Sequence, residues 1–135
     1  MTNLMFSKPT KKVKVKKTLN KVRKTPLAKM KREADKLAGE KCRARGKCQI
    51  CGSTNVLQWA HIISRRYHCV RWRMDNCLCL CSVCHCRYTN NPDLWIEWIV
   101  DHYDKNFKEL MDIVHKQPKV NREFMENVIA ELNEL

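Results

Sequence analysis

The sequence predicts a small α+β fold in which a cysteine-rich core lies between an N-terminal basic helix and C-terminal amphipathic helices. Two observations predict the core. Eight of the nine cysteines fall within residues 47–91, and β-branched and aromatic residues gather over residues 56–63, which is typical of a strand. Apolar residues at helical spacing on both sides of this region predict the flanking helices. A chain of 135 residues has room for about one small domain.

The first predicted helix covers residues 25–46, with Thr25 at the N-cap, Pro26 at the first helical position and Gly46 at the end. Its apolar stripe consists of Leu27, Met30, Ala34, Leu37 and Ala38. A second helix start, Asn91-Pro92-Asp93, precedes three amphipathic stretches over residues 94–103, 107–114 and 124–135. We expect Trp95 and Trp98 to be core anchors within residues 92–135, and His68, His102 and His115 to be surface residues.

Between these helices, the core region 47–91 has a less regular pattern. Residues 56–63 predict a strand, residues 64–75 are basic and are expected to be irregular, and residues 76–88 could open a helix.

The net charge of +13 is large for this length and is unevenly distributed. Residues 1–24 are rich in lysine and free of acids, so we expect a disordered arm, whose densest lysines are Lys11, Lys12, Lys14, Lys16 and Lys17. Residues 92–135, in contrast, hold more acids than bases. A polyanion, DNA or RNA, is the natural partner of the basic part, ahead of a merely solvated tail or an anionic lipid surface. No apolar run predicts a membrane span or a secretory signal, so a cytoplasmic location is expected.

Two Cys-x-x-Cys pairs, Cys48/Cys51 and Cys81/Cys84, predict a structural zinc site, because each tight turn presents two thiolates to one ion. Three alternatives remain open. Cys79 or Cys86 could replace one of the second pair, His85 could displace one thiolate, and a Cys-x-x-Cys pair could instead be a redox motif.

Between and after the zinc ligands, the chain reads Ala60-His61-Ile62-Ile63-Ser64-Arg65, then Asn76 to Cys81, and finally Cys84-His85. Over residues 48–89 this pattern resembles the His-Asn-His (HNH) endonuclease motif in its cysteine-flanked form. Over roughly residues 25–105, the chain is more loosely similar to the phage NinG (Rap) recombination endonucleases. The resemblance implies a ββα-metal fold, a catalytic Mg²⁺ or Mn²⁺ ion, and a phage enzyme working in the host cytoplasm. The implied substrate is branched recombination DNA, such as a Holliday junction, or a duplex that the enzyme nicks.

The resemblance also implies roles for individual residues. His61 takes the position of the general base, His85 that of a metal ligand, and Asn76 either binds the metal or holds the loop that carries His61. Arg65 is expected to clamp a phosphate oxygen. Three further arginines are expected to track the DNA backbone: Arg66, Arg71 and Arg73.

The sequence departs from the family pattern in two places. Ala60 stands where many members have a metal-binding Asp or His, so Asp75 or water could fill the metal shell, and Tyr88 replaces a usual Lys. His61 could also be an ordinary core histidine. The prediction is therefore a metal-dependent DNA endonuclease. The alternatives are a non-catalytic zinc-finger DNA-binding module and, third, an RNA-binding zinc protein. A homodimer formed through the acidic C-terminal helices is a further conjecture.

Overall fold

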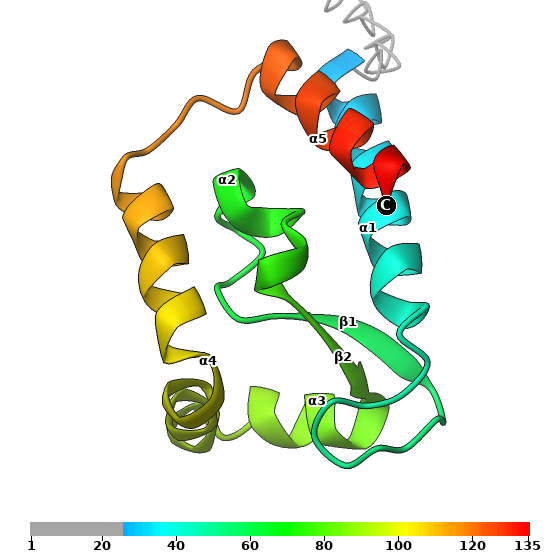
Figure 1. Ribbon diagram of the computed structural model, residues 1–135, viewed down its shortest axis with the longest axis vertical. Helices are drawn as coiled ribbons and strands as arrows, with labels where there is room; N and C mark the ends of the chain where they lie inside the picture. The colour runs from blue at the N-terminus through cyan, green and yellow to red at the C-terminus, as the bar shows by residue number, and fades with distance from the viewer. Residues whose placement is uncertain (1–25) are drawn as a thin grey trace, which may run out of the picture.

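The computed structural model describes residues 26–135, so the lysine arm and the predicted N-cap Thr25 lie outside the described residues. Five α-helices, one short 3₁₀ helix and a two-stranded sheet make up this part of the chain (Figure 1). In chain order the elements are α1 (Pro26–Arg43), β1 (Leu57–His61), α2 (His68–Arg71), η1 (Met74–Asn76), β2 (Cys77–Cys81), α3 (Ser82–Thr89), α4 (Pro92–His115) and α5 (Arg122–Glu134). The predicted α+β class is confirmed.

The sheet pairs β1 with β2 in antiparallel register, with Trp59 opposite Cys79 and His61 opposite Cys77. The strand predicted over residues 56–63 is therefore confirmed with narrower bounds. The expectation that residues 76–88 open a helix is wrong for its first half, because residues 77–81 form β2. Every residue of β2 is buried, and a short run of buried apolar residues has no periodicity that separates a strand from a helix.

The helix in this region, α3, begins only after β2. Cys81 is its N-cap, and the Sγ of Cys81 accepts a hydrogen bond from the backbone N–H of Cys84 at 3.4 Å. β1 and β2, with α2 and η1 between them in the chain, thus form a strand pair, and α3 follows β2 and packs against both strands.

Residues 64–75 are not irregular throughout, as the sequence suggested, because they contain α2 and η1. These elements are only four and three residues long, too short for a helical pattern to be visible in the sequence. Their buried residues Val70, Trp72 and Asn76 point inward and fix the segment against the rest of the molecule.

Two large apolar clusters hold the elements together, and a third, smaller one contains Cys42, Cys77 and Cys79. The first joins the sheet to α2 and α4 through Val70, Leu78, Leu80, Ile99 and Leu110. The second lies between α1, α5 and the end of α2 and contains Ala34, Ala38, Trp72, Met125 and Leu132. Figure 1 shows α1 and α5 side by side on one side of the sheet, with α4 on the other.

The C-terminal helices begin close to where the sequence predicts. α4 starts at Pro92 and continues to His115, so one helix contains the first two predicted amphipathic stretches. Tyr103, at the end of the first stretch, has non-helical backbone angles (φ −138°, ψ 25°) that kink the helix. Trp95 and Trp98 are half-buried and pack against the first cluster, as expected of core anchors. No helix within residues 26–135 is long and apolar enough to cross a membrane.

Candidate functional site

The predicted four cysteines come together. The Sγ atoms of Cys48, Cys51, Cys81 and Cys84 all lie within 4.8 Å of one another. The Sγ atoms of Cys51 and Cys81 are 3.7 Å apart, close to the edge of about 3.8 Å expected for a tetrahedron with zinc–sulfur bonds of about 2.3 Å. Four convergent thiols are the donor set that structural zinc prefers, so this cluster could hold a zinc ion.

Local backbone structure presents the first cysteine pair. The N–H of Gly52 donates to the carbonyl of Cys48 at 2.9 Å, and Gly52 has a φ of +75°, which glycine adopts without strain. Burial opposes ionisation of Cys48, but N–H groups of Cys51, Cys81 and Ile50 donate to its sulfur and lower its pKa to about 6. A lowered pKa favours the thiolate of Cys48, the form of cysteine that binds a metal.

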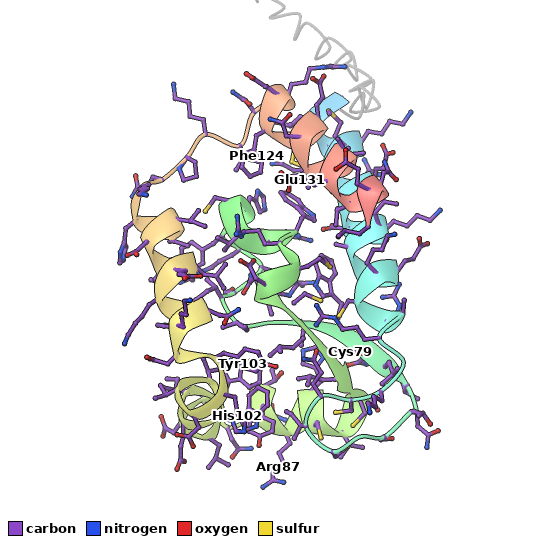
Figure 2. The ribbon with its side chains drawn as sticks, in the orientation of Figure 1. Cys79, Arg87, His102, Tyr103, Phe124 and Glu131 are labelled. Carbon is purple, nitrogen blue, oxygen red and sulfur yellow. The ribbon has the colours of Figure 1, made fainter. Side chains whose placement is uncertain are left out.

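Gln49 lies between Cys48 and Cys51 and links the loop that carries this cysteine pair to two other elements. Its Oε1 accepts from the N–H of Cys79 in β2 at 2.7 Å, and its Nε2 donates to the hydroxyl of Tyr103 at 3.1 Å. Tyr103 is the residue at which α4 bends (Figure 2).

The alternative zinc ligands lie elsewhere. Cys79 is buried in a separate cluster with Cys42 and Cys77, and Cys86 is exposed on α3. His85 is not part of the four-thiol group. The structure therefore brings together the two pairs that the spacing predicts.

His61 and His85 line one open pocket of about 100 Å³. Its other lining residues are Ala60, Leu80, Tyr88, Thr89 and Trp95. The pocket thus lies between β1, α3 and the start of α4, and it brings together the first and last residues of the predicted motif.

The ring of His61 is fixed in one orientation. Its Nε2 lies 3.1 Å from the carbonyl oxygen of Arg71, and its ring packs 4.4 Å from that of Trp59. Because a carbonyl can only accept, Nε2 carries the proton and Nδ1 keeps its lone pair. Burial, with help from nearby arginine charges, lowers the pKa of His61 to about 4. The ring is therefore neutral at pH 7, and the lone pair on Nδ1 is available as an acceptor.

His85 shows the complementary arrangement. Its Nδ1 lies 2.8 Å from the Oε1 of Gln58, an acceptor, so Nδ1 carries the proton and Nε2 is free. Burial lowers the pKa of His85, which favours the neutral ring that metals bind. A hydrogen-bond acceptor on the ring nitrogen that does not bind the metal is typical of metal-binding histidines.

Asn76 is fully buried, and its side chain holds the loop that follows His61. Its Oδ1 accepts from the N–H of Ile63 at 2.7 Å, while its Nδ2 donates to the carbonyls of Ile63 at 3.1 Å and Val70 at 3.0 Å. Asn76 is also not among the residues that line the histidine pocket. These contacts support the loop-holding alternative and not ligation of a catalytic ion.

The predicted DNA-contacting arginines divide into two groups. Arg65 and Arg66 are exposed, and the guanidinium of Arg66 lies over the ring of Tyr67. Arg71 instead forms two 2.8 Å bonds to the carboxylate of Asp35, and its side chain is only 19% exposed. This pairing gives Arg71 a partner within the protein, and its expected role in tracking a DNA backbone stays a prediction.

Arg73 and Asp75 form a similar pair with each other, through bonds of 2.9 and 2.8 Å. Both line a second, larger groove beside α5, which also includes Phe124 and Glu131 (Figure 2), and not the histidine pocket. Asp75 is therefore wrongly placed to complete the shell of a metal ion bound by His85. Arg73 is paired with Asp75 but its side chain is 48% exposed, and its expected backbone-tracking role stays a prediction.

One basic residue near the pocket escaped the sequence-based prediction. Arg87, two residues after His85, is exposed, projects into solvent (Figure 2) and lies over the ring of Tyr88, a pocket residue. Its nearness to His85 in the sequence was the available signal.

The arrangement combines a four-thiol site with a pocket in which two neutral histidines each keep one free nitrogen. Comparisons of this chain with protein-family models, with curated proteins and with solved structures found no match.

Proposed function

We propose that the protein is a metal-dependent endonuclease that hydrolyses phosphodiester bonds in DNA. The observation that carries the proposal is the shared pocket of His61 and His85, in which hydrogen bonds fix the free nitrogens as Nδ1 of His61 and Nε2 of His85. A base and a metal ligand beside each other are what metal-assisted hydrolysis requires.

In this proposal, Nδ1 of His61 accepts a proton from a water molecule, and the resulting hydroxide attacks the phosphorus. The bond between phosphorus and the leaving sugar oxygen then breaks, this oxygen takes a proton from solvent, and His61 returns its proton to solvent. A divalent ion, when bound, stabilises the negative charge that develops on the phosphate and on the leaving oxygen. The buried contacts of His61 with Trp59 and Arg71 keep its ring aimed during this step.

His85 is the residue that would hold the catalytic ion, through Nε2. Among the described residues that line the pocket, His85 is the side chain best suited to this role once His61 acts as the base. Nitrogen ligands bind divalent transition metals, among which Mn²⁺ is held most weakly, whereas Mg²⁺ is held mainly by oxygen ligands. We therefore propose Mn²⁺ rather than Mg²⁺ as the more effective ion, with water completing its shell. The four cysteines would hold a separate, structural zinc ion.

DNA is the proposed substrate because the chain is strongly basic and because exposed arginines lie close to the pocket residues in sequence. Arg65 follows His61 by four residues, and Arg87 follows His85 by two. Phosphate contacts of this kind position DNA without reading its sequence. Branched recombination intermediates or nicked duplexes, in a phage context, are the substrates that the sequence resemblance implies.

A second candidate is a non-catalytic zinc-dependent DNA-binding module. It is favoured by one observation: Ala60, which lines the pocket, supplies no metal ligand.

A cleavage assay separates the two candidates. Zinc-loaded protein is incubated with labelled linear, nicked and four-way-junction DNA in the presence of Mn²⁺, Mg²⁺ or EDTA, alongside His61→Ala and His85→Ala. His115→Ala, which changes an exposed histidine at the end of α4, is the matched control. We expect Mn²⁺-dependent cutting that both pocket variants lose and the control keeps. Equal DNA binding by all four proteins without any cutting would establish the binding module instead.

A further inference from the structure

Asp35, on α1, gathers three hydrogen bonds from two consecutive residues. Its Oδ1 accepts from Arg71 Nε at 2.8 Å and from Trp72 Nε1 at 2.7 Å, and its Oδ2 accepts from Arg71 Nη2 at 2.8 Å. The carboxylate is about one-third exposed, whereas Trp72 is buried. A bidentate, charge-assisted pair of this kind fixes direction as well as distance.

The same segment holds His61 from its other side. Arg71 is the last residue of α2, where a carbonyl lacks a partner within its helix, and this carbonyl lies 3.1 Å from His61 Nε2. A continuous path therefore runs from the carboxylate of Asp35, through residues 71 and 72, to the imidazole of His61.

We propose that Asp35 is a positioning residue for His61. The inference rests on the proposed function for its catalytic meaning, but its structural content does not. Asp35 clamps Arg71 and Trp72, the clamp fixes the Arg71 carbonyl, and the carbonyl keeps the proton on Nε2 so that Nδ1 is the free base. α1 is thus a working part of the site, although it lies outside the two strands and helix that carry the motif residues.

Asp35 in this role differs from an acid that only stabilises the fold through an ion pair. A partner that only stabilises the fold would leave the ring of His61 unchanged in a protein that is still folded. A positioning partner controls the ring through the Arg71 carbonyl, so its removal alters the His61 N–H proton signal and the turnover rate together.

The test uses zinc-loaded, ¹⁵N-labelled full-length protein and compares the wild type with Asp35→Ala, Asp35→Glu and Glu33→Ala. Glu33 is an exposed acid on the same helix and serves as the matched control. In the wild type and in Glu33→Ala, we expect an observable His61 Nε2–H proton signal, protected from exchange by its hydrogen bond. In Asp35→Ala, we expect this signal to be lost, with partial recovery in Asp35→Glu.

On DNA with Mn²⁺, we expect kcat of Asp35→Ala to fall about 10- to 100-fold, the size typical of a misplaced catalytic group, while KM changes little. If Asp35→Ala does not fold, Arg71→Lys replaces it, because lysine keeps the charge but cannot form the two-pronged bond. It is expected to lose the same signal.

A folded Asp35→Ala protein that keeps the His61 signal would overturn the inference, as would an unchanged kcat after the signal is lost. If the wild type cuts no DNA, the proposed function fails, while the N–H signals still decide whether Asp35 positions His61.

Discussion

The Oε1 of Gln58 lies 2.8 Å from the Nδ1 of His85 and ties strand β1 to helix α3 through the ring proposed to bind the catalytic metal. The two residues are 27 positions apart in the chain, and the bond selects which nitrogen of His85 stays free.

This contact predicts the effect of replacing Gln58. Gln58→Leu removes the acceptor and leaves the His85 Nδ1–H without its partner, so we expect the affinity for Mn²⁺ to fall about 10- to 100-fold. Manganese binding followed by electron paramagnetic resonance measures the change. Asn55→Ala, in the exposed turn before β1, is the control. Unchanged Mn²⁺ binding in Gln58→Leu would show that His85 is not oriented through this bond.

The four-cysteine cluster predicts a zinc requirement for folding. Cys84→Ser removes a buried ligand, whereas Cys86→Ser changes an exposed cysteine on the same helix. We expect purified wild type and Cys86→Ser to contain zinc and to unfold cooperatively, and Cys84→Ser to lose both properties, because structural zinc contributes about 10 kcal/mol or more to such folds. Metal analysis and thermal unfolding measure this. Stoichiometric zinc in a cooperatively folded Cys84→Ser protein would contradict the assignment.

The depressed pKa of His61 predicts a pH-dependent stability. Because its pKa is about 4 when folded and about 6.5 when unfolded, the unfolded chain binds an extra proton between these values. The stabilisation is complete above about pH 6.5 and is lost as the pH falls towards 4, by about 1–3 kcal/mol after allowance for partial exposure.

Denaturant unfolding of wild type and His61→Gln at several pH values checks this prediction. The wild type should lose more stability than the variant between about pH 7 and about pH 5. Parallel pH curves for the two proteins would mean that His61 is not held neutral by its surroundings.

The contacts of Asn76 predict a large structural effect. Asn76→Ala leaves the N–H of Ile63 and the carbonyls of Ile63 and Val70 without their buried partner. We expect a loss of about 2–4 kcal/mol in the free energy of unfolding, measured by denaturant titration. Asn90→Ala, at an exposed position after α3, should change stability by less than about 0.5 kcal/mol. A similarly small effect at Asn76 would argue that its hydrogen bonds contribute little.

The features that sequence predicted best are local. Each of these features depends on residues that are neighbours in the chain, so the sequence alone can reveal it. They are the two Cys-x-x-Cys pairs, the start of α4 at Pro92 and the strand containing His61. β2 was missed because its five buried residues alternate only between cysteine and leucine, and burial on both faces leaves no period to detect.

The electrostatic pairings of the site could not be predicted in the same way. Arg71 looks like any exposed base in the sequence, and only the fold brings Asp35, 36 positions earlier, against it. Asp75 and Arg73, in contrast, are near neighbours, but the sequence does not tell that their pair faces the groove beside α5.

Gln49 connects the loop that carries Cys48 and Cys51 to other parts of the fold. Its amide group fastens the loop to β2 on one side and, through Tyr103, to the bend of α4 on the other. A metal ion held by the four cysteines would set the shape of this loop and, through Gln49, the position of α4, which carries Trp95 at the rim of the histidine pocket. We expect loss of zinc to release α4 from the loop and so to open that pocket, although the four-cysteine site does not contact the pocket.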